Sequence, residues 1–219
     1  MKSVKAVIFD VDGLLLNTEF LWLQTWKDVG TKYGVPAFGR IFHRTVGLTG
    51  QAVNDILDEE LGDCAERIKL LDEARQTGMK NLDEKIAVMP GALNLLDYLK
   101  EHNILAAVAT TTDRKRTDER LKKLGLYDRF SVILCGDEVI KKKPDPEIYQ
   151  KVLNRLGLKT DDALVLEDTG YGVQAAHSAG IRVIMVPSVN SATEDEKEIA
   201  YAVVQSLDDV VRLFREGNL

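Results

Sequence analysis

Two aspartates, Asp10 and Asp12, close a short apolar run near the start of the chain, within Phe9-Asp10-Val11-Asp12-Gly13. Residues two apart in an extended chain point the same way, so both carboxylates can converge on one spot. Such a pair can attack an electrophile, transfer protons or bind a cation. The same pair could also cap a helix or solvate a loop, so its interpretation depends on what other segments bring to it.

A hydroxyl-rich segment, Thr110-Thr111-Thr112, follows the apolar run 104–109. A hydroxyl directly after a buried strand, at a helix N-terminus, can donate to a phosphate oxygen beside free backbone N–H groups. Threonine is also an ordinary helix cap, and this segment taken alone favours that simpler interpretation. It becomes informative only together with the other strand ends.

Two charged segments complete the set of candidate groups. Lys143 stands immediately before a turn rich in proline, in Lys141-Lys142-Lys143-Pro144-Asp145-Pro146. Glu167 and Asp168 follow the apolar run 163–166 and enter a loop that contains glycine. Two adjacent carboxylates at the end of an apolar strand are costly unless a cation is present.

These segments follow short apolar runs that are typical of strands buried on both faces. Between the runs lie helical patterns that begin at proline and end before glycine, as helices commonly do. Strands that alternate with helices predict an α/β fold with a doubly wound parallel sheet, whose ligands bind at the carboxyl ends of the strands. The predicted strands are residues 6–9, 104–109, 132–134, 163–166 and 183–186.

The region from residue 17 to residue 84 has a different pattern. Its apolar residues recur at helical spacings, and it is too long for a simple crossover between parallel strands. Asp63 and Glu66 resemble a helix-capping pair before another apolar run. We expect a small all-α domain at 17–84, inserted into an α/β domain formed by 1–16 and 85–219.

The order of these signals, DxDG, then Thr, then Lys-Pro, then Glu-Asp, resembles the haloacid dehalogenase superfamily of phosphohydrolases. The insertion resembles the helical cap of the β-phosphoglucomutase-like branch of that superfamily. The resemblance covers nearly the whole chain. It implies a Rossmann-like core and a magnesium-dependent phosphatase that acts through a phospho-aspartate on a small phosphorylated metabolite, with a sugar phosphate as the candidate substrate.

The resemblance also implies roles for individual residues. Asp10 would be the nucleophile and Asp12 the general acid and base. Mg²⁺ would be held by Asp10, by the backbone carbonyl of Asp12 and by Asp168, with Glu167 in the same acidic cluster, either as a ligand or as the partner of Lys143. The candidate phosphate contacts are Gly13, Thr110, Thr111 and Lys143, and the candidate cap contacts are Trp22 and Arg44.

The cap sequence bears on the reaction. β-Phosphoglucomutases carry a histidine and an arginine where this chain has Trp22 and Gly50. This difference favours a phosphatase over a phosphosugar mutase, which stays open as an alternative. A non-catalytic phospho-acceptor resembling a receiver domain is a second alternative, against which the long insertion and the second aspartate, Asp12, both count.

Composition limits the possible partners and the compartment. Lys and Arg number 29 against 35 Asp and Glu, which gives a net charge of −6 and argues against nucleic acid and anionic membranes as partners. Cys64 and Cys135 lack the spacing of a metal site or a disulfide framework, so we expect reduced thiols in a cytoplasmic protein. No apolar stretch approaches the length of a membrane span. The sequence does not indicate an oligomeric state.

Overall fold

The computed structural model describes residues 4–48, 50–62 and 65–219, and the chain forms two compact units. The core unit comprises Met1–Leu16 and Ala87–Leu219, and the cap unit comprises Asn17–Ile86. The boundary expected after residue 84 falls inside the last turn of helix α4 (Ala65–Lys85). The expected capping pair, Asp63 and Glu66, and the neighbouring Cys64 lie outside the residues whose side chains are described.

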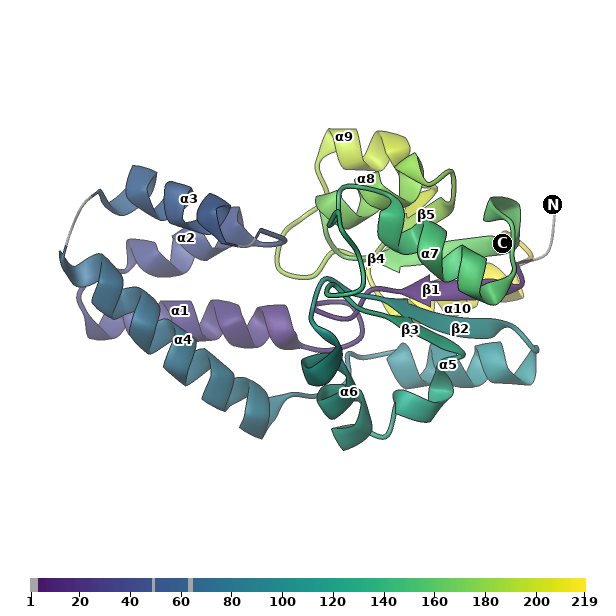
Figure 1. Cartoon of the computed structure of the whole chain (residues 1–219), viewed down its shortest axis with the longest axis horizontal. Helices are drawn as coiled ribbons and strands as arrows, with labels where there is room; N and C mark the ends of the chain where they lie inside the picture. The colour runs from purple at the N-terminus through teal and green to yellow at the C-terminus, as the bar shows by residue number, and fades with distance from the viewer. Residues whose placement is uncertain (1–3, 49, 63–64) are drawn as a thin grey trace. The chain divides into compact units, whose positions relative to one another are not determined.

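The core unit is built on a six-stranded sheet in which every strand pairing is parallel, with the order β3-β2-β1-β4-β5-β6. This confirms the expected doubly wound α/β fold (Figure 1). β6 was not foreseen, because two residues are too few to show a periodic pattern. The strands are β1 (Ala6–Phe9), β2 (Leu105–Ala109), β3 (Val132–Leu134), β4 (Ala163–Glu167), β5 (Arg182–Met185) and β6 (Ala202–Val203).

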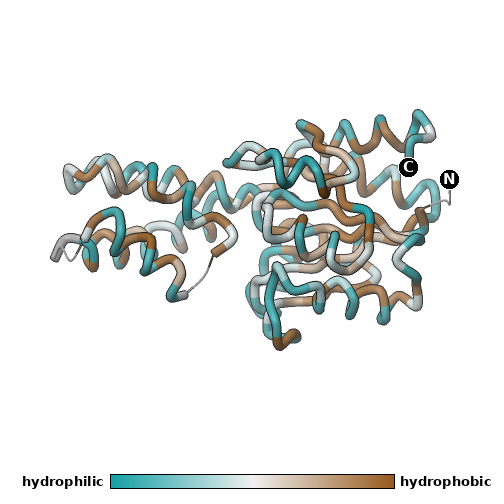
Figure 2. The backbone as a smooth tube through the Cα atoms, turned by 90° about the horizontal axis from the view of Figure 1, so that it is seen from above, coloured by the Kyte–Doolittle hydropathy of each residue, from teal (hydrophilic) through white to brown (hydrophobic). Residues whose placement is uncertain are grey.

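Helices cover both faces of this sheet. α7 and α8 lie on one face, and α5 and α10 pack together on the other (Figure 1). Figure 2 shows the hydrophobic strands in the middle of the core unit, flanked by helices in which hydrophilic and hydrophobic positions alternate. The helices are α5 (Ala92–Glu101), α6 (Arg114–Lys123), α7 (Glu147–Leu156), α8 (Gly170–Ser178), α9 (Glu194–Ile199) and α10 (Leu207–Arg215).

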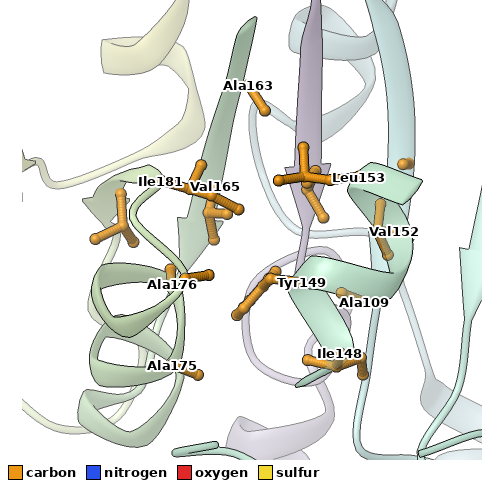
Figure 3. Packing of buried hydrophobic residues seen from close by; sticks show 14 of the residues in the cluster. Ala109, Ile148, Tyr149, Val152, Leu153, Ala163, Val165, Ala175, Ala176 and Ile181 are labelled. Atoms are coloured by element: carbon orange, nitrogen blue, oxygen red, sulfur yellow. The ribbon is translucent and has the colours of Figure 1, made fainter. Parts of the chain in front are cut away.

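The helix signals of the sequence are confirmed at α7. Pro146 is its N-cap residue, and Gly157 ends it in the left-handed conformation at φ 66°. Only glycine adopts this conformation without a steric cost, which explains why the helix stops there. The apolar face of α7, with Tyr149 and Val152 completely buried, packs on β2 and β3 and belongs to the core cluster shown in Figure 3.

In its described residues the cap unit forms the helices α1 (Thr18–Lys32), α2 (Ala37–Thr45), α3 (Gln51–Leu61) and α4. Aromatic packing joins the first two: the ring of Trp26 stacks on Phe38 with centroids 4.2 Å apart and meets Phe42 edge-on at 5.4 Å. α1 also contacts α4, where the indole of Trp22 lies against Gly78. A Cβ atom at Gly78 would lie 2.0 Å from that ring, so the close approach of the two helices requires glycine.

Candidate active site

Three neighbouring strands end at the same level of the sheet. Phe9, the last residue of β1, is paired with Val108 of β2 and with Leu166 of β4. The residue after each of these positions therefore lies at one edge of the sheet, and the amide of Asp10 donates to the carbonyl of Leu166 at 3.0 Å. This register brings Asp10 close to the 110–112 segment on one side and to Glu167 on the other.

A tight turn directly after β1 keeps the second aspartate, Asp12, near the end of the strand. Gly13 has φ 89°, a conformation that favours glycine, and its amide donates to the carbonyl of Leu16 at 2.9 Å. The amides of Leu15 and Leu16 both donate to the carbonyl of Val11 at 3.0 Å. These bonds fold the chain back directly after β1, so Asp12 stays near the strand end. Gly13, expected as a phosphate contact, is buried and serves this turn.

Lys143 reaches the centre of this edge from the loop before α7. Its ammonium group donates to Asp10 Oδ1 at 2.6 Å, to Glu167 Oε1 at 2.5 Å and to the carbonyl of Ala109 at 3.0 Å. The side chain is only 5% exposed, and the peptide bond to Pro144 is cis. Burial disfavours the charged form of Lys143, but the two adjacent carboxylates outweigh burial and hold its pKa well above the usual value. Lys143 is therefore a fixed positive charge.

Donors from the chain surround the carboxylate of Glu167. Its Oε1 also accepts from the hydroxyl of Tyr149 at 2.6 Å, and its Oε2 accepts from the amide of Asp168 at 3.2 Å and from the hydroxyl of Thr169 at 3.3 Å. Tyr149 is fully buried on α7, and burial followed by the charge of Glu167 raises its pKa well above the usual value, so it remains a donor. Tyr149 gives no sequence signal, because buried tyrosines on helix faces are ordinary core residues.

Asp10 has an unusual electrostatic environment. Burial raises its pKa, Lys143 lowers it, and Glu167 and Asp12 raise it again, with a result of about 7. A carboxyl group with this pKa is partly protonated near neutral pH, and only the ionised form is a nucleophile. A cation bound nearby would favour the ionised form.

Asp12 is held by residues from the β2–α6 segment. Arg120 Nη1 donates to Asp12 Oδ1 at 2.9 Å, and the hydroxyl of Thr112 donates to Oδ2 at 2.6 Å. The hydroxyl of Thr110 lies 3.5 Å from the same oxygen and accepts from the amide of Thr112 at 3.1 Å. Thr111, half-buried, has its carbonyl packed against Gly136. Arg120 was missed, because one arginine in a strongly basic helix gives no sequence signal.

Asp168 completes the acidic group. Its Oδ2 accepts from the hydroxyl of Ser188 at 2.6 Å, a residue that the sequence analysis missed although it follows the strand β5 closely. Asp10, Glu167 and Asp168 each present a carboxylate oxygen, and these atoms lie within 4.8 Å of one another. All three residues are buried.

The donor chemistry of this group fits Mg²⁺. Carboxylate oxygens are the ligands that this ion prefers. When ionised, Asp10, Asp12, Glu167 and Asp168 carry two more negative charges than Lys143 and Arg120 neutralise, so a divalent cation would balance the site. Both oxygens of Glu167 already accept from donors of the chain, which makes Asp10 and Asp168 the better placed ligands.

Trp22 and Arg44, the candidate cap contacts, have different surroundings. Trp22 lines a pocket of about 270 Å³ within the cap unit, together with Trp26, Glu19 and Arg75. The guanidinium of Arg44 is paired with Glu59 at 2.8 Å and with Glu60, so a substrate would have to compete with two carboxylates for it. Trp22 thus borders a space that could take a ligand, whereas Arg44 joins α2 to α3.

Two further expectations concern the chain as a whole. Cys135 is a free thiol, and burial raises its pKa to about 11, so it is neutral at physiological pH. Within residues 4–48, 50–62 and 65–219, no helix combines the length and apolar character that crossing a membrane requires.

Comparisons with known proteins agree with this geometry. The phosphorylated carbohydrates phosphatase of Thermotoga maritima is 35% identical over 98% of this chain and 92% of its own length. Protein CbbY of Rhodobacter capsulatus is 32% identical over 88% of this chain and 89% of its own length. A Thermotoga maritima crystal structure provisionally described as a beta-phosphoglucomutase superposes with a TM-score of 0.78, at 32% identity, over 97% of this chain and 99% of the other.

The match to a family extends over most of the chain. Residues 7–186 match the haloacid dehalogenase-like hydrolases, a span that runs from β1 through the cap unit to the end of β5. The expectation of a hydrolase of this kind is confirmed. The chain belongs to the haloacid dehalogenase-like hydrolase family.

Proposed function

We propose that this protein is a magnesium-dependent phosphatase that hydrolyses the phosphate monoester of a small sugar through a phospho-Asp10 intermediate. The observation that carries the proposal is the contact between Asp10 and Lys143, which joins a buried carboxylate to a fixed ammonium group at 2.6 Å. A nucleophile beside a permanent cation at the carboxyl ends of parallel strands suits attack on an anionic phosphate.

Lys143 and Thr110 are the proposed partners of the transferring phosphoryl group. An ammonium group within reach of the Asp10 carboxylate is also within reach of an oxygen on the phosphorus atom that Asp10 attacks. Glu167 keeps this ammonium group in place and is itself held by Tyr149. We therefore assign Glu167 to the positioning of Lys143 and not to metal ligation.

Two chemical steps follow from this arrangement. In the first, Asp10 forms a bond to phosphorus, the ester oxygen leaves, and Asp12 supplies the proton that the leaving alkoxide needs. In the second, water attacks phosphorus, its proton passes to Asp12, and the bond between phosphorus and Asp10 breaks. Asp12 ends as it began, and the products are an alcohol and inorganic phosphate.

The same site would hold Mg²⁺ through Asp10, the backbone carbonyl of Asp12 and Asp168. The bound ion would supply positive charge between the attacking carboxylate and the anionic phosphate. At 4 Å two like unit charges repel by about 4 kcal/mol at an effective dielectric constant of about 20, which is the size of the obstacle that this charge removes. Ser188 orients the Asp168 carboxylate for ligation.

A sugar phosphate is the proposed substrate class because of the relatives. The Thermotoga maritima relative is named a phosphorylated carbohydrates phosphatase. A crystal structure of CbbY from Rhodobacter sphaeroides, 27% identical with a TM-score of 0.71 over 93% of this chain and 95% of the other, contains xylulose-(1,5)-bisphosphate.

The test is a screen of sugar phosphates and p-nitrophenyl phosphate for release of inorganic phosphate, with Mg²⁺ or with EDTA. We expect sustained turnover that needs Mg²⁺ and disappears in Asp10→Asn, while Asp195→Asn, an exposed aspartate on α9, serves as the matched control. Reduction of the acyl phosphate with borohydride should convert Asp10 to homoserine during turnover, which mass spectrometry detects. Release of a single equivalent of p-nitrophenolate without continued release of phosphate, or turnover by Asp10→Asn, would contradict the proposal.

A phosphosugar mutase is the second candidate, favoured by the likeness to the structure described as a beta-phosphoglucomutase. Trp22 and Gly50 stand where mutases of that branch carry histidine and arginine, which favours hydrolysis. The two reactions differ in their product. Conversion of glucose 1-phosphate to glucose 6-phosphate, faster than release of inorganic phosphate, would identify the mutase.

A further inference from the structure

The carboxylate of Asp12 is held at both oxygens by the segment that follows β2. We call Arg120 and Thr112 the Asp12 clamp. Arg120 Nη1 donates to Oδ1 at 2.9 Å, and Thr112 Oγ1 donates to Oδ2 at 2.6 Å. The side chains of Arg120 and Asp12 are 15% and 22% exposed, so the ion pair is largely shielded from water. A shielded, charge-assisted pair is stronger and more directional than a surface ion pair.

The two members of the clamp are close in sequence: Thr112 lies just before α6, and Arg120 lies on it. Thr112 directly precedes Asp113, the N-cap residue of α6, whose side chain accepts from the amide of Arg116. Arg120 lies seven residues, about two helical turns, after this N-cap residue, and residues seven apart occupy the same face of a helix. α6 therefore links the two donors, and within it the buried Thr117 donates to the carbonyl of Asp113 at 2.9 Å.

The clamp orients Asp12 without using up its capacity to accept protons. Each carboxylate oxygen can accept about two hydrogen bonds, and the short bonds of the clamp use one on each oxygen. The two occupied lone pairs fix the plane of the carboxylate, and they therefore also fix the directions of the lone pairs that remain free to accept a proton. A carboxyl group that rotates freely would present these positions in many directions, whereas proton transfer requires a defined distance and angle to the reacting oxygen.

We propose that Arg120 and Thr112 are positioning residues that hold the Asp12 carboxylate in the orientation needed for proton transfer. The inference rests on the proposed function, because the clamp can affect the reaction only if Asp12 transfers protons to and from the substrate. Neither residue is proposed to touch the phosphate, and so the clamp should influence turnover and leave substrate binding unchanged.

Steady-state kinetics of clamp variants provide the first test. For a sugar phosphate, whose two chemical steps both need Asp12, we expect Arg120→Met and Thr112→Val to lower kcat by about 10- to 100-fold, a part of what a general acid and base contributes, with KM changed by less than about twofold. Thr112→Ser keeps the hydroxyl and should restore kcat. Arg116→Met is the matched control, because Arg116 is the same residue type on the same helix but pairs with the helix cap Asp113 at 3.5 Å.

A double-mutant cycle separates this role from a merely structural one. If the clamp acts only through Asp12, Arg120→Met should have no further effect on the residual rate of Asp12→Ala.

A pre-steady-state assay adds a second signature. The p-nitrophenolate group leaves without needing a proton, so the first step does not depend on Asp12. Hydrolysis of the phospho-enzyme does depend on it, because a proton must be removed from the attacking water. Arg120→Met should therefore show a burst of p-nitrophenolate followed by slow turnover.

The outcomes are distinguishable. Unchanged kcat in Arg120→Met, or an equal loss in the presence and absence of Asp12, would overturn the inference while leaving an active wild-type enzyme and the proposed function intact. If Arg120→Met does not fold, the pair of Thr112→Val and Thr112→Ser decides alone, and equal rates for the two overturn the inference. A wild-type protein without phosphatase turnover overturns the proposed function, and the inference with it.

Discussion

The buried carboxyl group of Asp10 should make the protein less stable as pH rises. Asp10 has a pKa of about 7 in the folded protein, against an ordinary value of 3.8, because burial penalises its charged form. Between these two values the unfolded chain loses the proton while the folded chain keeps it. Stability contributed by the protonated group is therefore fully present below about pH 4 and is lost as pH rises toward about 7.

The substitution Asp10→Asn removes this titration and keeps the shape of the side chain. The amide resembles the protonated carboxyl group, and its oxygen can still accept from Lys143. A pKa difference of about 3 units corresponds to about 4 kcal/mol at 1.36 kcal/mol per unit, so above pH 7 the variant should be more stable than the wild type by up to about 4 kcal/mol. At about pH 5 the same linkage gives a difference of only about 1–2 kcal/mol.

Urea denaturation at about pH 5, 6.5 and 8 measures this difference as the free energy of unfolding. EDTA must be present, because a bound cation would favour the ionised form of Asp10 in the wild type. Asp195→Asn, which removes an exposed carboxylate on α9, is the control and should follow the wild type at every pH. The reasoning is refuted if Asp10→Asn is less stable than the wild type at pH 8, or if the difference between them does not grow with pH.

Three other substitutions test the contacts around Glu167. Gly172→Ala would place a Cβ atom 1.9 Å from the Glu167 carboxylate. We therefore expect at least a 10-fold loss of kcat together with a lower Tm. Wild-type values of both kcat and Tm would be inconsistent with this packing. Tyr149→Phe removes a buried donor to Glu167 and should lower the free energy of unfolding in urea by about 1–3 kcal/mol, whereas no loss would mean that the 2.6 Å bond contributes nothing. Lys143→Met removes the fixed charge beside Asp10 and should lower kcat by about 10²–10³-fold in the phosphate-release assay; a loss below 10-fold would argue against Lys143 as a phosphate partner.

Local patterns were sufficient to predict the main strands of the core unit and the ends of some of its helices. β1, β2, β4 and β5 agree with the predicted runs to within one residue at either end, because strands buried on both faces are continuous apolar segments. α7 begins and ends at its proline and glycine signals, because these residues act on backbone dihedral angles within a few positions of themselves. The two-residue strand β6 had no such signal.

The approach of Asp10 to Glu167 also followed from the sequence. Parallel strands have their carboxyl ends at one edge of the sheet, so groups placed directly after apolar runs must gather there. Lys143 does not directly follow a strand, and its place beside Asp10 was implied only by the family resemblance. The family resemblance added the roles, which remain predictions for this chain.

The pairings of side chains on helices were decided only by the tertiary structure. Arg120 with Asp12 and Tyr149 with Glu167 join residues from different segments, and each depends on which face of a helix packs toward the sheet. A periodic pattern shows that a helix has a buried face, but it does not specify which partner that face meets. The strand order, with β1 between β2 and β4, selected these partners, because packing and charge neutralisation at a strand end depend on the neighbours across the sheet and not along the chain.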